Sequence, residues 1–329
     1  MGRITIKTAQ TKTHANSHVL AVVGSKVPES QKTSSPMPML AGIATAFLWG
    51  ISFLFTKDAL SYTFPMQVLG LRFAAGASLM SVLAALRLIK LDFKGKGIGS
   101  LILLSLFQPF LYFIGETWGV KWTSASEAGM VIGIVPVTTA LMAAIFLHER
   151  MRVLQVLSVI ASVIGVFVIV GTKGQLSIGQ HAFGILALLL AVISTSVYSI
   201  LTKISSQRFT SVEITFVMMW MGAILFNLIG ISQSASQGTV WTYLSPLSNP
   251  PVLVAVIYLG FLSSVGGFFL YNYALSGLKV SQSAPLINLI TVVSVVGGVL
   301  FQGDSFGWVE SAGIGLIIAG VWGTTAFAN

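Results

Sequence analysis

The sequence contains no cysteine and few charged residues. Of its 329 residues, only 8% are Asp, Glu, Lys or Arg, whereas soluble domains carry about 25%. The missing cysteines exclude a disulfide framework, a thiolate metal site and a thiol nucleophile. A water-soluble protein of this length could not cover its surface with so few charges, so the composition predicts a protein that crosses a membrane several times.

Histidines and the usual catalytic signatures are also scarce. The four histidines lie in the amino-terminal tail or at the ends of apolar segments: His14, His18, His148 and His181. The HExxH, GxSxG and phosphate-loop patterns do not occur. Because no metal site, cofactor site or catalytic triad has a candidate, we predict a protein that is not an enzyme, with no cofactor and no metal.

Apolar residues are abundant, at 55% of the chain with a mean hydropathy of +0.89. A helix needs about 20 apolar residues to cross the hydrocarbon core, and runs of this length are too long for barrel strands. We therefore predict an all-α polytopic membrane protein with ten transmembrane helices. The predicted spans are Met39–Leu60, Met66–Ile89, Ile98–Trp118, Glu127–Leu147, Val153–Gly171, His181–Lys203, Val212–Ile231, Pro251–Leu275, Val280–Gln302 and Gly307–Phe327.

The basic residues predict the orientation of the chain. Lys and Arg concentrate in the tail and in connections on the same side, at Arg87, Lys90, Lys94, Lys96, Arg150, Arg152, Lys203, Arg208 and Lys279. This asymmetry predicts cytoplasmic termini in the cell membrane. It also accounts for the net charge of +9, so the partners that we predict are the lipid bilayer and a small-molecule substrate, with no nucleic acid. We expect a monomer or a weak homodimer.

The first 36 residues are polar, basic and rich in Ser and Thr. A disordered cytosolic tail, an organelle transit peptide and a start codon assigned too early are three readings that their composition leaves open. The transit-peptide reading would place the protein in an organelle membrane.

One layout occurs twice, from Tyr112 to Arg150 and from Phe268 to Asp304. Each copy has an apolar run, a polar elbow that ends in serine (Ser126, Ser281), a second apolar run and an acidic stop (Glu149, Asp304). A polar linker, 172–180, divides the spans into repeats at 37–171 and 181–329. Because five is an odd number, the second repeat enters from the opposite side and the two five-helix repeats are inverted, which is a transporter architecture.

Ionisable residues inside spans are costly and are usually functional. Arg72 lies about six residues into its span, roughly 9 Å from the outer end. It could form a structural ion pair, extend toward the interface or contact an anionic substrate. Glu116 and Glu127 lie at a similar depth; we predict that Arg72 pairs with Glu116, which would also be the residue for proton coupling. Facilitated diffusion is an equally supported alternative.

Several uncharged residues are candidates for a substrate pathway. Polar and aromatic side chains at depth either line a cavity or pack between helices, and both readings stay open for Trp49, Phe53, Tyr112, Asn272 and Asn288. Pro109 and Pro136 fall within spans, where each frees backbone groups and marks either a hinge or a static kink.

The stretches AFLWGISFLFTKDAL, GETWGVKWTSASEAGMVIGIVPVTTALMAAIFLHER and YALSGLKVSQSA resemble EamA-type carriers of the drug/metabolite transporter superfamily. The resemblance covers about residues 39–327. It implies ten helices in two inverted repeats, a central cavity, alternating access and secondary transport, usually efflux of amino acids, metabolites or drugs. Family landmarks match Trp49, Gly50, Arg72, Glu116, Pro136 and Glu149. The chain departs from the family at Thr291, where a proline is usual.

We therefore predict a secondary transporter, and in particular an exporter of small metabolites, amino acids or drug-like solutes. A nucleotide-sugar or sugar-phosphate carrier is the alternative among transporters. A membrane scaffold or receptor that transports nothing is the alternative from another class.

Overall fold

The computed structural model describes residues 36–122, 131–171, 182–302 and 307–327, and within them every regular element is a helix. The first half contains α2 (Met37–Leu60), α3 (Pro65–Ala85), α4 (Gly99–Ser105), η1 (Leu106–Leu111), α5 (Tyr112–Trp122), α7 (Val135–Phe146) and α8 (Val153–Gly171). The second half contains α9 (Ala182–Ser205), α10 (Ser211–Ser236), η2 (Val240–Thr242), η3 (Ser245–Ser248), α11 (Pro250–Ile257), η4 (Tyr258–Gly266), α12 (Gly267–Gly277), α13 (Val280–Ser283), η5 (Ala284–Asn288), α14 (Leu289–Gln302) and α15 (Trp308–Ala326).

In the described residues, 5 helical segments are long and apolar enough to cross a membrane: Pro65–Ala85, Gly99–Gly119, Phe183–Ser205, Ser211–Ser236 and Pro250–Gly277. Shorter apolar helices, of 10–17 residues, overlap the other predicted spans. The second span ends earlier than we predicted, because Arg87 adopts a φ of 59° and the chain leaves the helix there. The start of the fourth predicted span, the 172–180 linker, Ser126 and Asp304 lie outside the described residues.

Two of the long segments contain π-helical turns. In the first, η1 holds Pro109, and Gln108 before it has non-helical dihedral angles. In the second, η4 contains no proline and separates α11 from α12. Pro136 is the second residue of α7, directly after a turn at residues 133–134. Both prolines thus lie at breaks in the regular helix, as a hinge or a static kink would require.

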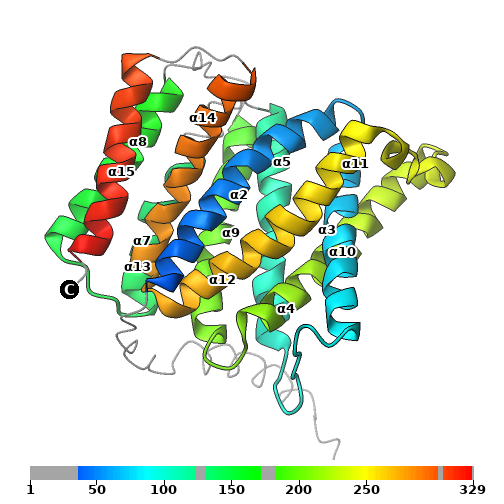
Figure 1. Ribbon diagram of the computed structural model, residues 1–329, viewed down its shortest axis with the longest axis horizontal. Coiled ribbons are helices and arrows are strands. Elements are labelled where there is room, and N and C mark those ends of the chain that lie inside the picture. Colours follow the sequence, from blue (N-terminus) through cyan, green and yellow to red (C-terminus); the bar gives the residue numbers. More distant parts are fainter. Residues whose placement is uncertain (1–35, 123–130, 172–181, 303–306, 328–329) are drawn as a thin grey trace, which may run out of the picture.

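Several of the main helix contacts occur in matching pairs when the two halves of the chain are compared. In the first matching pair, α5 of the first half packs on α9, and its counterpart α12 in the second half packs on α2. In the second, α7 packs on α9 and α14 on α2. Two further pairs join equivalent helices, α3 with α10 and α8 with α15. Figure 1 shows the α8–α15 pair at one side of the bundle and the α3–α10 pair at the other.

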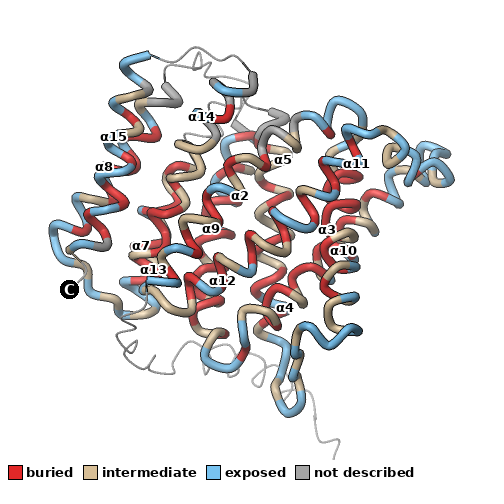
Figure 2. The backbone as a smooth tube through the Cα atoms, viewed as in Figure 1, coloured by how far each residue is buried: buried red, intermediate tan, exposed pale blue. Residues whose placement is uncertain are grey.

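Buried residues are frequent along α2, α3, α9, α10 and α12, whereas α8 and α15 have many exposed residues (Figure 2). The buried core includes large aromatic side chains, among them Phe73, Tyr198, Phe226, Phe268 and Tyr271. Close helix approach depends on glycine at a few positions. A Cβ on Gly115 would lie 2.5 Å from the carbonyl oxygen of Ala187, so α5 and α9 meet backbone to backbone.

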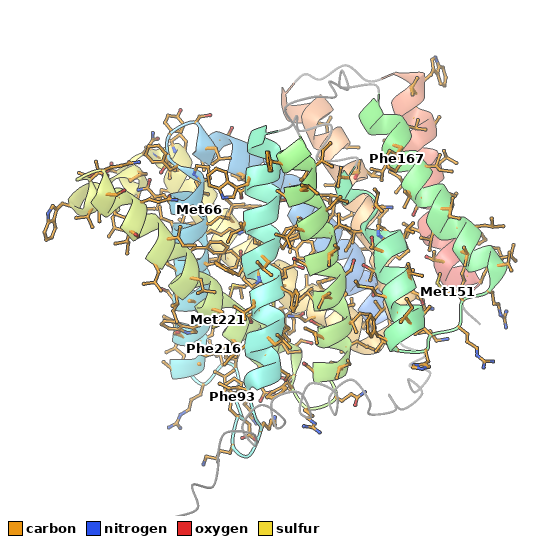
Figure 3. The ribbon with its side chains drawn as sticks, turned by 180° about the vertical axis from the view of Figure 1, so that it is seen from behind. Met66, Phe93, Met151, Phe167, Phe216 and Met221 are labelled. Atoms are coloured by element: carbon orange, nitrogen blue, oxygen red, sulfur yellow. The ribbon has the colours of Figure 1, made fainter. Side chains whose placement is uncertain are left out.

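The connections that carry most of the described Lys and Arg residues lie at one end of the bundle, which we call the basic end. They are segments 86–98, 147–152, 206–210 and 278–279, and in Figure 1 they lie at the lower end with the start of α2 and the end of α15. Phe93 and Phe216 meet at this end, with ring centres 6.3 Å apart (Figure 3). We call the other end, with the 61–64 and 237–249 connections, the opposite end.

Candidate functional site

Arg72 is a buried cation inside the bundle. Its side chain is 5% exposed and comes from the first half of α3. Its Nε donates to Ser264 Oγ at 2.7 Å and its Nη2 donates to Ser263 Oγ at 3.0 Å. The guanidinium carbon lies 4.9 Å from the ring centre of Phe113. An arginine at the centre of a membrane helix costs about 3 kcal/mol or more, and hydroxyls with an aromatic face offset part of that cost.

The two serines belong to the π-helical segment η4. Adjacent residues of a regular α-helix point about 100° apart, yet Ser263 and Ser264 both bond the guanidinium of Arg72. Single-turn π-helical insertions recur at functional sites. We did not identify these serines from the sequence, although a pair of hydroxyls within the apolar run of η4 was a readable signal.

Glu116 lies on α5, one turn beyond Tyr112, whose hydroxyl donates to Glu116 Oε1 at 3.2 Å. Our predicted ion pair between Arg72 and Glu116 is not formed within 4 Å. Among the described residues, the ion pair within that limit joins Lys96 to Glu213 at 3.2 Å. The reason is that Arg72 bonds the serines and Glu116 bonds its own neighbour, although the two charges still attract over a longer distance. Glu127 lies outside the described residues.

Trp49 joins α2 to η4, the segment whose serines bond the side chain of Arg72. Its Nε1 donates to the backbone oxygen of Ser263 at 3.0 Å. Its ring lies 5.2 Å from that of Phe268 and 5.3 Å from that of Tyr271, centre to centre. Of the predicted pathway residues, Trp49 and Arg72 thus contact η4, whereas Tyr112 and Glu116 bond each other on α5. The side chain of Phe53 lies outside the described part.

The two predicted asparagines connect helices instead of meeting Arg72. Asn272 accepts from Tyr198 Oη at 2.5 Å and donates to Thr215 Oγ1 at 3.0 Å, which ties α9, α10 and α12 together. Asn288 donates to Ser162 Oγ at 3.1 Å and ties η5 to α8. Both side chains are buried with partners, so their observed contacts are those of packing residues.

Glu149 binds the start of α13, where the ninth predicted span begins. Its carboxylate accepts from the backbone N–H groups of Val280 at 2.9 Å and Ser281 at 3.1 Å, and from Ser281 Oγ at 2.7 Å. The predicted acidic stop is thus also a capping group, because an anion stabilises the exposed N–H groups at the beginning of a helix. Beside it, Lys203 Nζ donates to the carbonyl oxygens of Ser276 at 3.1 Å and Leu278 at 2.6 Å.

Glu213 makes a second carboxylate contact at the basic end. It closes a capping box with Thr210 at the start of α10. The same carboxylate accepts from the backbone N–H of Asp92 at 2.9 Å and from Lys96 Nζ at 3.2 Å. Glu213 therefore holds the 86–98 connection against α10, and its side chain is 1% exposed.

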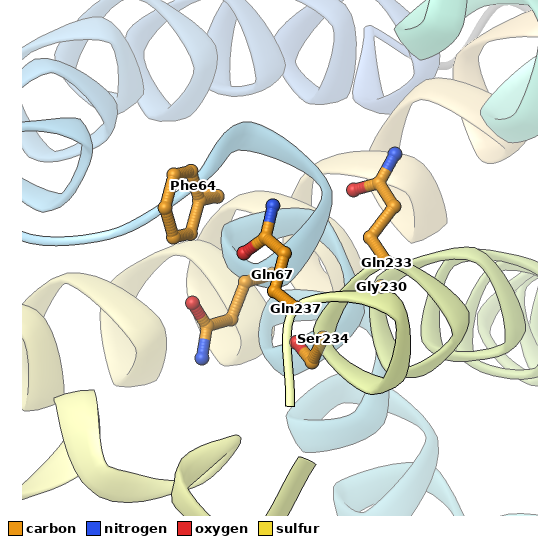
Figure 4. A pocket seen from close by; sticks show the side chains of 6 residues that line it. All are labelled: Phe64, Gln67, Gly230, Gln233, Ser234 and Gln237. Atoms are coloured by element: carbon orange, nitrogen blue, oxygen red, sulfur yellow. The ribbon is translucent and has the colours of Figure 1, made fainter. Parts of the chain in front are cut away.

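The opposite end is hollowed between α3, α5 and α10. One hollow, whose empty volume of ≈ 270 Å³ includes space open to solvent, is lined by Phe64, Gln67, Gly230, Gln233, Ser234 and Gln237 (Figure 4). An adjoining cavity of ≈ 770 Å³, which opens to solvent, is lined by Phe64, Pro65, Met66, Thr117, Trp118, Gln233, Ser236 and Gln237. No charged side chain lines either cavity. The polar groups that line them are amides and hydroxyls.

Comparison with known proteins places the chain in a family. The model of the EamA-like transporter family matches residues 36–171 and again residues 182–326. The chain belongs to the EamA-like transporter family. The two matches to this EamA family cover almost all of the described residues. Our predicted resemblance to EamA-type carriers is confirmed.

Two relatives extend the EamA assignment. The chain is 32% identical over 285 residues to the uncharacterized transporter YcxC of Bacillus subtilis, covering 87% of this chain and 91% of that protein. It is 30% identical over 220 residues to the "Probable terminal-alkyne amino-acid exporter" of Streptantibioticus cattleyicolor, covering 66% and 68% of the two chains. A solved crystal structure with 19% identity superposes with a TM-score of 0.74 over 90% of this chain and 98% of that one, which supports the fold alone.

Proposed function

We propose that the chain is a secondary transporter that exports small metabolites, amino acids or drug-like solutes by alternating access. In this proposal ten helices cross the cell membrane as two inverted five-helix repeats, with the basic end and both termini in the cytoplasm. The observation that supports it is the helix packing, in which several of the main contacts occur in matching pairs between the halves. Two equivalent halves can rock about a shared site and expose it to each side in turn.

Two further observations support the proposal. The family model matches each half separately, as a duplicated carrier would. The described Lys and Arg connections gather at one end, as the excess of positive charge in cytoplasmic loops would require. The amino-acid exporter among the relatives favours export of amino acids over other small solutes.

The alternative of a nucleotide-sugar or sugar-phosphate carrier has less support. Among the described residues, the buried cations are Arg72 and Lys203, and Lys203 already binds two backbone carbonyls. A site for several phosphate charges would need more than one free cation.

The test is transport by the purified protein in liposomes, with a panel of amino acids, metabolites, sugar phosphates and cationic dyes. We expect counterflow of at least one amino acid or metabolite, and none in liposomes without protein. Folded, monodisperse protein that moves no member of the panel would contradict the transporter proposal and favour a scaffold or receptor. Movement of sugar phosphates alone would favour the neighbouring branch.

A further inference from the structure

We propose that Arg72, Ser263 and Ser264 form a carboxylate-binding site, so that the exported solute must carry a carboxylate group. The inference rests on the proposed transport function and names the substrate chemistry of its central site. Within the described part of the chain, N–H groups of Arg72 have no acceptor.

The guanidinium of Arg72 has more donors than partners. An arginine side chain has five N–H groups and no acceptor. Among the described residues, its acceptors are the hydroxyls of Ser264 and Ser263. Three N–H groups therefore remain for another acceptor, on a side chain that is 5% exposed.

The two serines add donors at the same place. A hydroxyl has one donor and two acceptor positions, and in these serines an acceptor position is taken by Arg72. Other buried serines in helices, such as Ser105 and Ser199, donate to a carbonyl oxygen one turn earlier. Ser263 and Ser264, both 0% exposed, make no such bond within the described part of the chain. Their O–H groups can point toward the ligand of Arg72.

Among the described residues, no carboxylate lies within ion-pair distance of Arg72. Ser263 and Ser264 are neutral, Phe73 and Phe113 present rings to the guanidinium, and Glu116 accepts from Tyr112 instead of pairing with Arg72. A buried cation without an adjacent anion strongly favours an anionic ligand. The remaining N–H groups of Arg72 and the O–H groups of both serines belong to one hydrogen-bonded cluster, so one small anion bound there can accept from more than one of them.

The geometry favours a carboxylate over other anions. The planar guanidinium matches the two oxygens of a carboxylate in a paired arrangement. One cation neutralises one negative charge, which disfavours phosphate esters with two charges. The Arg72 contact joins α3 to η4, which belong to different halves of the chain, so separation of the halves would expose these donors to an entering solute.

The experiment compares three related solutes in liposomes containing the full chain: phenylalanine, phenylalaninamide and phenethylamine, with cationic dyes as a fourth arm. The amide and the amine lack the carboxylate but keep the ring and the amino group. We expect the wild type to move phenylalanine about 10- to 100-fold faster than either analogue, the range typical for a lost charge-assisted pair. Arg72→Gln should remove that preference, whereas Lys90→Gln, a change at an exposed cation, should keep it.

Binding to the wild type provides a second measurement in case Arg72→Gln does not fold. Phenylalanine should raise the unfolding temperature of the wild type and the amide should not, because a ligand stabilises the folded state that binds it. The proposed site would be contradicted if the wild type moved phenylalanine no faster than its amide. It would also be contradicted if a folded Arg72→Gln variant kept the preference for the acid. Flux of amines or dyes without acids overturns this inference alone, whereas no flux of any solute overturns the transporter proposal with it.

Discussion

The two ends of the bundle are held together by different chemistry. At the basic end, the charged groups of Glu149, Lys203 and Glu213 bind backbone groups of neighbouring segments. At the opposite end the contacts are uncharged: Gln67 donates to the carbonyl oxygen of Tyr243 at 2.5 Å, and Asn227 donates to that of Gly70 at 2.9 Å. Hydrogen bonds from charged groups are roughly twice as strong as neutral ones.

This difference coincides with where the bundle is hollow. The cavities lie at the end with amide contacts, and the charged contacts lie at the other. Glu149 and Glu213 each join an element of residues 37–171 to one of residues 181–329. If the halves rock, these carboxylate contacts must break for the basic end to open. The comparison therefore predicts that removing them shifts the protein toward a conformation open at the basic end.

Glu149→Ala should have the largest effect, because it leaves two backbone N–H groups at the start of α13 without their carboxylate acceptor. We expect about 2–4 kcal/mol, or roughly a 30- to 1,000-fold shift toward the open basic end. The absence of cysteine allows Ser276→Cys to report the opening as faster maleimide labelling. Asp58→Ala, at an exposed residue of the opposite end, is the matched control. Unchanged labelling in Glu149→Ala would show that this contact does not close the basic end.

Lys203→Met should have the next effect, since methionine keeps most of the apolar stem but removes the donors to Ser276 and Leu278. The expected loss is about 1–2 kcal/mol, measured by the same labelling and by thermal unfolding. Because Lys203 and Glu149 interact electrostatically, the double variant should lose less than the sum of the single changes. Strict additivity would mean that the two contacts act independently.

Lys96→Ala should weaken the Glu213 contact only slightly. The lysine side chain is 28% exposed, and Glu213 keeps its backbone donors from Asp92 and Thr210. We expect about 0.5 kcal/mol, and less at high salt, because exposed ion pairs are screened. Thermal unfolding at low and high salt measures the difference. A loss as large as that of Glu213→Ala would show that the lysine, and not the backbone donors, holds the connection.

Gln67→Ala tests the opposite end and should have a small and local effect of about 0.5–1 kcal/mol. It should enlarge the cavity that Gln67 lines and increase labelling of Gln233→Cys at the same end. Labelling of Ser276→Cys at the basic end should not increase. If Gln67→Ala increases labelling of both cysteines equally, the two ends do not open independently, contrary to what their different contacts suggest.

The sequence predicted the helical character of the chain and singled out the cationic side chain, because both are local properties. Apolar runs of sufficient length specify helices in a membrane, and Arg72 stands out because a cation is rare in such a run. The partners of Arg72 were not predictable in the same way. Arg72 and Ser264 are 192 residues apart, and their contact depends on the π-helical turn of η4, which contains no proline to mark it.

The roles of the other residues depended equally on distant contacts. The sequence left open whether Asn272 lines a cavity, and its bonds to Tyr198 and Thr215 place it in a packed junction. The donors of Glu149 come from residues more than 130 positions away. Residue type and depth identify groups that need a partner, whereas only the arrangement of the helices selects which partner they find.

The close packing of α8 against α15 affects how movement of one helix is transmitted to the rest of the molecule. Gly165 meets the backbone of Gly313, where a Cβ would come within 2.6 Å of the carbonyl oxygen, and Gly320 meets Ser158 and Ser162 with similar closeness. Such close backbone contact restricts sliding of one helix along the other, so we expect α8 and α15 to move together. The hydrogen bond from Asn288 to Ser162 connects this helix pair to η5. We therefore expect a tilt of α8 and α15 to be accompanied by a tilt of η5.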